Sequence, residues 1–232
     1  SYVEHRGITQ DLVEKFGIGF ALDDWHALKT FFDKKKIHLQ TAEKAGLLQN
    51  SKNNRGMFDR FRNRLMIPLR DVHGNTVGFT ARIMAKDQDG PKYMNSPETP
   101  VYHKGELLYG LSLAKVAIKK EKQVIIVEGN LDVIASHKAG VENVVASSGT
   151  ALTEQQLLLL KRFTQTLIFC FDQDAAGFQA ARRGMRLARQ FDFRIKVVLI
   201  PEDAGKDPDD VVQKDPELWR KAIQNPIPMM QY

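Results

Sequence analysis

The stretch Val124-Ile125-Ile126-Val127-Glu128-Gly129-Asn130-Leu131-Asp132 decides the fold, together with Leu167-Ile168-Phe169-Cys170-Phe171-Asp172-Gln173-Asp174. Each stretch begins as a run of apolar, largely β-branched residues and ends in two closely spaced carboxylates. Such runs are typical of buried strands in a parallel sheet, and ligands bind at the carboxyl ends of these strands. The sequence therefore predicts that Glu128, Asp132, Asp172 and Asp174 gather at one ligand-binding edge.

The second half of the chain alternates strands and helices throughout. We expect strands at 123–128, 143–147, 166–171 and 194–200, with helices at about 131–139, 153–163, 175–191, 208–213 and 215–224. Repeated βαβ units of this length predict a parallel sheet with helices on both faces. Thr153 is expected to cap its helix with the help of Gln156, which stands at the capping-box position.

The first half has a different pattern. Short helices are followed by a predicted hairpin of residues 64–70 and 76–82, in which Pro68 favours an edge position for the first strand. Residues 86–105 are predicted to form an extended loop, and 107–120 a connecting helix. The expected fold class is α/β, a parallel sheet flanked by helices (residues 106–232) preceded by a smaller α+β basic subdomain (residues 1–105).

The net charge of +6 is concentrated in one segment. Residues 51–105 hold ten Lys and Arg against five Asp and Glu, while the segments on either side are nearly balanced. A local excess of this kind indicates a polyanion partner, although a solvated surface would explain any one of these side chains alone. If residues 59–64 form a strand, three guanidinium groups share one face and match phosphate oxygens. The candidate phosphate ligands are Arg60, Arg62, Arg64, Arg82, Lys92 and Lys104.

Several classes of protein are excluded by what the sequence lacks. No apolar run approaches the roughly 20 residues that span a bilayer, so no membrane association is expected. Cys170 is the single cysteine, which rules out a disulfide framework and a Cys-based zinc site and favours a cytoplasmic setting. No Walker-type glycine loop is present. The chain starts without Met or a signal-peptide pattern, and we expect it to be a piece of a longer protein.

The four acids indicate a divalent metal. Carboxylates crowded at one edge repel one another unless a cation neutralises them, and oxygen ligands without Cys or His favour Mg²⁺, with Mn²⁺ as a substitute. Asp207 and Asp209, just past the fourth strand, are candidate outer ligands for a second cation. Helix capping is the alternative role for Asp132, Asp174 and Asp207, and it is compatible with metal binding.

These motifs in this order resemble the TOPRIM catalytic domain, and more narrowly the bacterial DNA primases of the DnaG class. The TOPRIM resemblance rests on Glu128-Gly129…Asp132, Gly149-Thr150-Ala151-Leu152-Thr153, Asp172-Gln173-Asp174-Ala175-Ala176-Gly177 and Asp207-Pro208-Asp209. The primase resemblance adds Arg6-Gly7-Ile8, Phe58-Asp59-Arg60-Phe61-Arg62-Asn63-Arg64, the stretch from Pro91 to Pro100, and His103-Lys104-Gly105 through Leu108-Tyr109-Gly110. It covers practically all 232 residues.

The resemblance implies a DNA primase core, a Mg²⁺-dependent nucleotidyltransferase that joins ribonucleoside triphosphates into RNA primers on single-stranded DNA. Glu128 becomes the general base or metal-orienting acid, and Asp172 and Asp174 the principal Mg²⁺ ligands. Further metal-site acids are Asp132, Asp207 and Asp209. The basic ridge for template and triphosphate is matched by Arg60, Arg62, Arg82, Lys92 and Lys104.

The resemblance also implies partners and a setting. A monomer in the bacterial cytoplasm is expected, and the replicative helicase and single-strand binding protein would be met through family domains that this chain lacks. The zinc module is among them, so no zinc is expected here. Departures from the family pattern are Asn130-Leu131, Gln173 and Thr80-Ala81, none of which removes a ligand.

Two other functions are compatible with parts of the sequence. The same acidic sheet cuts DNA in TOPRIM topoisomerases and nucleases, but a topoisomerase needs a tyrosine nucleophile, and Tyr93, Tyr102 and Tyr109 stand in primase-like contexts. A DNA-binding module without catalysis would use the acids only as helix caps. It predicts salt-sensitive binding to single strands and no Mg²⁺ site.

Overall fold

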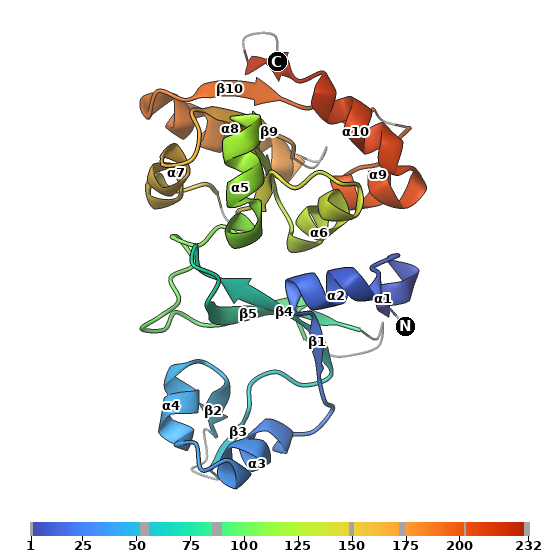
Figure 1. The fold of residues 1–232 in the computed structure, drawn as a ribbon. Helices are drawn as coiled ribbons and strands as arrows, with labels where there is room; N and C mark the ends of the chain where they lie inside the picture. The colour runs from blue at the N-terminus through green and yellow to red at the C-terminus, as the bar shows by residue number, and fades with distance from the viewer. Residues whose placement is uncertain are drawn as a thin grey trace.

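The chain folds into three stacked tiers (Figure 1). The computed structural model describes residues 2–51, 56–84, 90–148, 151–171, 175–201 and 203–229. A five-stranded, mostly parallel sheet with its helices forms one end, a four-stranded antiparallel sheet lies in the middle, and a small helical lobe with a two-stranded sheet forms the other end. Within these ranges no helix combines the length and the apolar character needed to cross a bilayer.

The first half supplies the middle tier and the small lobe. The middle sheet has the order β1-β4-β5-β6, and the lobe contains β2 paired with β3. Helix α2 ends where Gly17 takes a left-handed φ of 69°. The elements are α1 (Tyr2–His5), α2 (Gln10–Phe16), β1 (Gly19–Ala21), α3 (Ala27–Lys34), α4 (Leu39–Lys44), β2 (Leu48–Asn50), β3 (Met57–Asp59), β4 (Arg64–Arg70), β5 (Thr76–Ile83) and β6 (Tyr93–Asn95).

The second half follows the predicted alternation closely. Its sheet has the order β11-β10-β9-β7-β8, in which only β11 runs antiparallel to its neighbour. The elements are α5 (Leu111–Glu121), β7 (Val124–Val127), α6 (Asn130–Lys138), β8 (Val144–Ala146), α7 (Glu154–Lys161), β9 (Thr166–Phe169), α8 (Ala175–Gln190), β10 (Arg194–Val197), α9 (Pro208–Lys214), α10 (Pro216–Gln224) and β11 (Ile227–Pro228). The predicted α/β class is confirmed.

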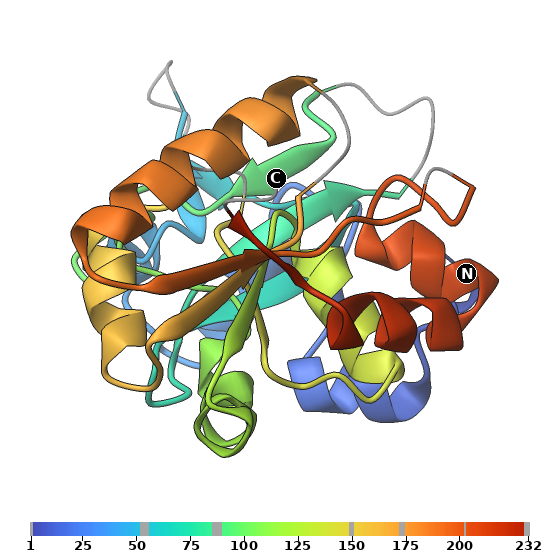
Figure 2. The same ribbon diagram turned by 90° about the horizontal axis from the view of Figure 1, so that it is seen from above.

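Helices cover both faces of this sheet (Figure 2). Helices α5, α7 and α8 pack on one face, with Phe169 of β9 at the centre of their core. Helices α6, α9 and α10 cover the other face. The predicted cap at Thr153 is confirmed, because its hydroxyl accepts from the Gln156 N–H at 3.2 Å while the Gln156 side chain accepts from the Thr153 N–H at 3.1 Å.

One apolar core joins the middle tier to the parallel sheet. Ile8, Leu12 and Phe16 of the N-terminal segment belong to the same buried cluster as Val127 and Ile134. A backbone ladder adds to it, since Tyr109 and Ala146 exchange two hydrogen bonds of 2.9 and 3.0 Å. The small lobe has its own separate core around Phe32, Ala42 and Leu48.

Three local predictions are corrected. Strand β4 lies between β1 and β5, so it is not the edge strand that Pro68 predicted. Because β1 pairs only with residues 64–66, Pro68 itself has no partner strand on the β1 side. The loop predicted for 86–105 contains β6, which pairs with β5. The connecting helix begins at Leu111 and not at 107, because Gly110 turns the chain with a φ of 83°.

His137 is buried where the N-terminal segment meets α6. Its side chain has no exposed surface, its ring meets Phe16 edge-on at 5.0 Å, and neither ring nitrogen has a hydrogen-bond partner among the described residues. The nearest carboxylate, Glu142, lies 3.8 Å from Nδ1. Burial, helped by the charge of Lys15, lowers the pKa of His137 to about 4.

This buried imidazole predicts a loss of stability in mild acid. In the unfolded chain His137 binds a proton near pH 6.5, whereas in the folded chain it does so only near pH 4. The contribution of His137 to the free energy of unfolding therefore falls as pH drops through this window, by about 2 kcal/mol at pH 5. Urea unfolding of wild type and His137→Leu at pH 7.5 and pH 5 measures it. The wild type should lose about 2 kcal/mol more than the variant between these two pH values. Equal losses would show that the imidazole is not the cause, and His103→Leu, at an exposed site, is the control.

Candidate active site

A cavity of about 490 Å³ opens where the carboxyl edge of the parallel sheet faces the middle tier. Both acidic and basic side chains line it. The acids are Glu128, Asp132, Asp207, Asp209 and Asp210, and the bases are Arg6, Lys92, Lys104 and Lys206. Four of the predicted metal-site acids and two of the predicted phosphate ligands therefore share one cavity.

Glu128 and Asp132 are held by the turn between β7 and α6. Glu128 follows the last residue of β7 directly and is half-buried. Asp132 lies in the first turn of α6 and accepts a 2.9 Å hydrogen bond from the Gly129 N–H. A Cβ at position 129 would lie 2.8 Å from Asp132 Oδ2, so glycine allows the carboxylate to fold back this closely.

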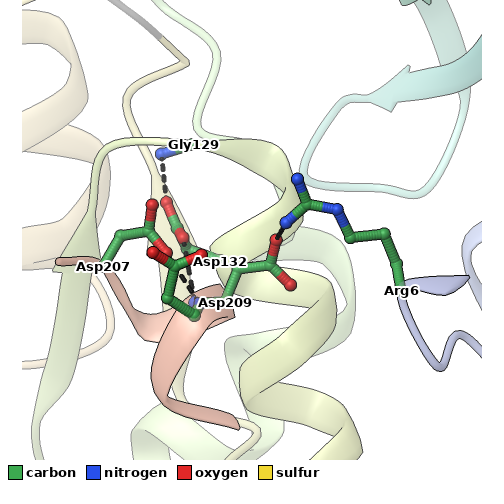
Figure 3. A network of polar contacts seen from close by, with 6 residues as sticks. Arg6, Gly129, Asp132, Asp207 and Asp209 are labelled. Carbon is green, nitrogen blue, oxygen red and sulfur yellow. Dashed lines mark hydrogen bonds and ion pairs between the residues drawn. The ribbon is translucent and has the colours of Figure 1, made fainter. Parts of the chain in front are cut away.

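Asp132 also ties α6 to α9. Its second oxygen, Oδ1, accepts from the Asp209 N–H at 3.3 Å (Figure 3). The capping role that the sequence offered as an alternative is thus real for Asp132, and it comes with a second contact from a helix 77 residues away. Capping is equally real for Asp207, which accepts from the Asp210 N–H at 2.8 Å at the start of α9.

Asp209 is buried and is paired with Arg6. An Arg6 Nη donates to Asp209 Oδ2, and the Gln213 side chain donates to the same carboxylate. Figure 3 shows the Arg6 guanidinium reaching across to Asp209 from the N-terminal segment. Burial raises the pKa of Asp209 and the Arg6 charge opposes that rise, while burial likewise raises the pKa of Asp207. A cation close to these two carboxylates would offset the free-energy cost of burying their negative charge.

Asp172 and Asp174, the other predicted metal ligands, lie outside the described residues, as do Gly149 and Thr150. In the part of the chain that is described, no three acidic, histidine or cysteine side chains come together as a metal site. The carboxylates of Glu128, Asp132, Asp207 and Asp209 are the right donors for Mg²⁺ and line one cavity. They fit a divalent ion as contributors to a site that Asp172 and Asp174 are predicted to complete.

The predicted row of arginines is wrong. Strand β3 ends at Asp59 and β4 begins at Arg64, and between them Asn63 takes a left-handed φ of 49°, which breaks the alternation. Asp59 is buried and accepts from the N–H groups of Leu28 and Lys29, so it caps α3.

The three arginines consequently diverge. Arg62 stacks on Trp25, with its guanidinium carbon 3.7 Å from the ring centroid. Arg64 is buried and donates to the Pro91 carbonyl at 3.0 Å. Arg60 lies over the Phe61 ring, and burial lowers its pKa. None of the three lines the 490 Å³ cavity.

Arg82 contributes to the cavity wall indirectly. Its guanidinium lies 4.0 Å from the Tyr2 ring centroid and 5.8 Å from that of Tyr93, and Tyr2 also carries Arg6 at 5.5 Å. Tyr93 lines the cavity beside Lys92. Desolvation raises the pKa of the Tyr93 phenol, and the Arg82 charge opposes that rise.

Arg6 is a site residue that the sequence motifs did not assign. It stands 203 positions before Asp209, and only its place in the Arg6-Gly7-Ile8 motif marked it. Lys206 was also missed, although its position directly before Asp207 was visible in the sequence.

The comparisons with known proteins agree with this geometry. Residues 1–115 match the family described as DNA primase catalytic core, N-terminal domain, and residues 125–212 match a Toprim-like family. A DNA primase of Halalkalibacterium halodurans is 44% identical over 96% of this chain, and one of Clostridium acetobutylicum 41% identical over all of it. The chain spans 37% and 38% of the length of these two relatives.

Solved structures give the same result. A DNA primase domain from Pseudomonas aeruginosa superposes with a TM-score of 0.89 at 37% identity, covering all of this chain and 72% of that one. The RNA polymerase domain of the Mycobacterium tuberculosis primase gives 0.89 at 35% identity, covering 99% of this chain and 76% of that one. A catalytic domain solved with bound single-stranded DNA gives 0.87 at 35% identity, covering 98% and 71%. The chain belongs to the family of bacterial DnaG-type DNA primase catalytic cores.

The Arg6–Asp209 pair predicts an unusual double-mutant cycle. Arg6→Met leaves a buried carboxylate without its cation and should cost about 1–2 kcal/mol, less than a fully buried pair because the Arg6 side chain is 24% exposed. Adding Asp209→Asn removes the stranded charge and should restore most of that loss. Urea unfolding at pH 7.5 of both single variants and the double variant measures the cycle. A double variant less stable than Arg6→Met would contradict it, and Lys138→Met serves as a neighbouring control.

Proposed function

We propose that this chain is the catalytic core of a DNA primase, joining ribonucleoside triphosphates into RNA along a single-stranded DNA template. The observation that carries the proposal is the shared cavity, in which Glu128, Asp132, Asp207 and Asp209 face Lys92 and Lys104. Nucleotidyl transfer needs both, because a nucleophilic oxygen must be activated beside a triphosphate whose charge must be neutralised. The relatives at about 40% identity support it.

In this proposal the residues have distinct roles. Glu128 holds or accepts the proton of the primer 3′-hydroxyl, whose oxygen bonds to the α-phosphorus of the incoming nucleotide while pyrophosphate leaves. Asp172 and Asp174, with Asp132, Asp207 and Asp209, hold Mg²⁺, or Mn²⁺ in its place. Held by these carboxylates, the metal would supply charge neutralisation and Lewis acidity. Lys92, Lys104 and Lys206 attract the phosphates.

Arg6 has a positioning role. It neutralises Asp209 while its side chain stays 24% exposed and lines the cavity, so its charge can be shared between the carboxylate and an approaching phosphate. Arg82 packs on the rings of Tyr2 and Tyr93, and of these two Tyr93 lines the cavity. Arg60 and Arg62 are assigned to the template path outside the cavity, where the Arg62 guanidinium stacked on Trp25 offers a platform of the kind that single strands use. Arg64 is buried and supports this region through its hydrogen bond to the Pro91 carbonyl.

The two halves of the chain have different functions in this proposal. Residues 1–105 form the basic subdomain that guides the template, and 106–232 form the catalytic TOPRIM domain. The setting is the bacterial cytoplasm, where the chain acts as a monomer. The helicase and the single-strand binding protein bind to other domains of the longer family proteins.

Primer extension tests the proposal. The chain is incubated with single-stranded DNA carrying a short annealed RNA, labelled ribonucleotides and Mg²⁺. Extended RNA is expected, and it should be abolished by chelation. Glu128→Gln and Asp172→Ala should each lower the rate by at least about 100-fold, the loss typical for a group that acts on the reacting atoms.

The control for these variants is Glu154→Gln, an exposed carboxylate in the first turn of α7 and away from the cavity. It should extend RNA at the wild-type rate. Absence of any extension by the folded wild type, with Mn²⁺ as well as Mg²⁺, would refute the proposal. Relaxation or nicking of supercoiled plasmid in its place would establish the DNA-cutting alternative.

A further inference from the structure

Helix α8 turns a strongly basic face to solvent. Ala181, Met185 and Ala188 are buried on its inner side, and at Gly184 a Cβ would lie 3.2 Å from the Phe169 ring, so the helix packs tightly onto β9. The outer side carries exposed arginines at helical spacing. They are Arg182, Arg183, Arg186 and Arg189, and this set is the α8 arginine face.

Few acids accompany the α8 arginine face in its own stretch of the sequence. Residues 179–196 hold six Lys and Arg against one acid, Asp192. Arg186 has like-charged neighbours at i−4, i−3 and i+3, an arrangement that repels itself on a helix. Other helices pair such charges, as Lys29 does with Asp33 in α3. Among the described residues, Arg183, Arg186 and Arg189 form no ion pair.

The position of the helix relates this charge to the site. Helix α8 begins at residue 175, directly after the predicted ligands Asp172 and Asp174. It lies on the face of the sheet opposite α6 and α9 (Figure 2). Its 16 residues extend for about 24 Å, which corresponds to about seven base pairs of a duplex. A strand leaving the catalytic edge on this side would pass along the arginines.

The chemistry of the face fits a duplex backbone better than a single strand. Single-strand sites combine charge with aromatic rings on which bases stack. The chain has such combinations elsewhere, at Trp25 with Arg62 and at Tyr93 with Arg82. The described outer residues of α8 are Gln and Arg, without an aromatic side chain. Guanidinium groups alone recognise phosphate and leave the bases unread.

We propose that the α8 arginine face binds the phosphate backbone of the RNA–DNA duplex as it leaves the catalytic cavity. The inference rests on the proposed function, because the duplex is the product of that reaction. It assigns the template and the product to different surfaces. The single strand runs past the aromatic and basic groups of the first half of the chain, and the duplex runs along α8.

A direct binding measurement tests whether α8 binds the RNA–DNA duplex, and it requires no catalysis. The affinity of the whole chain for a fluorescent 12-base-pair RNA–DNA hybrid and for the corresponding single-stranded DNA is measured by anisotropy, without Mg²⁺, over a range of salt concentrations. The test variant is Arg186→Gln with Arg189→Gln. The matched control is Lys214→Gln with Lys221→Gln, two exposed lysines of α9 and α10 on the opposite face.

The test variant should bind the hybrid about tenfold more weakly, and the slope of log affinity against log salt should shrink by about 1.8, which corresponds to two lost phosphate contacts. Single-strand binding should stay within about twofold of wild type, and the control should match wild type on both. Unchanged hybrid binding would overturn the proposal. So would a loss that is equal for the single strand, or equal in the control.

Primer extension separates this inference from the proposed function. With Mg²⁺, the test variant should add the first nucleotide at the wild-type rate and make shorter products as salt rises, because the duplex is released early. A variant that loses the first addition would contradict an exit surface. If the wild type extends no RNA, the polymerase proposal is refuted. Binding of the hybrid to α8 is tested separately, by the anisotropy measurement.

Discussion

Negative charge kept away from water at the carboxyl edge of the parallel sheet is the constraint on which the rest of this structure depends. A buried carboxylate is stable only if donors or a cation compensate its lost hydration. Asp132 obtains two backbone N–H groups, one from its own turn and one from α9. Asp209 obtains Arg6, which the first turn of the molecule brings to it. The N-terminal segment, α6 and α9 are therefore held together by the same carboxylates that the proposed chemistry uses.

The parallel sheet could be predicted because its signal is local. Four apolar runs, each followed by a helix of regular periodicity, leave few topologies. The acids at the strand ends could also be placed at one edge, since strand ends in a parallel sheet share an edge. Their exact partners could not be predicted. The contact of Arg6 with Asp209 spans 203 positions, and no pattern in one sequence specifies such a pairing.

The errors come from places where tertiary contacts overrule periodicity. Alternation in residues 59–64 suggested a strand, but Asn63 turns the chain and Arg62 stacks on Trp25. Averaging concealed the charge of α8, because residues 106–232 as a whole are nearly neutral, although four of their seven arginines lie on that one helix and five of their 16 acids line the cavity. Charge per segment is informative only when the segment corresponds to a surface.

The separate core of the small lobe has a mechanical consequence. The middle tier and the parallel sheet share one continuous cluster of apolar side chains, so neither can pivot against the other without opening that cluster. Among the described residues, the apolar cluster of the lobe formed by α3, α4, β2 and β3 is small and separate. The lobe meets the rest through the chain around Trp25 and Arg62 and where Gly46 lies against Pro97 and Thr99. Local opening follows the distribution of buried contacts. Opening of this small cluster would leave the shared core of the other two tiers intact.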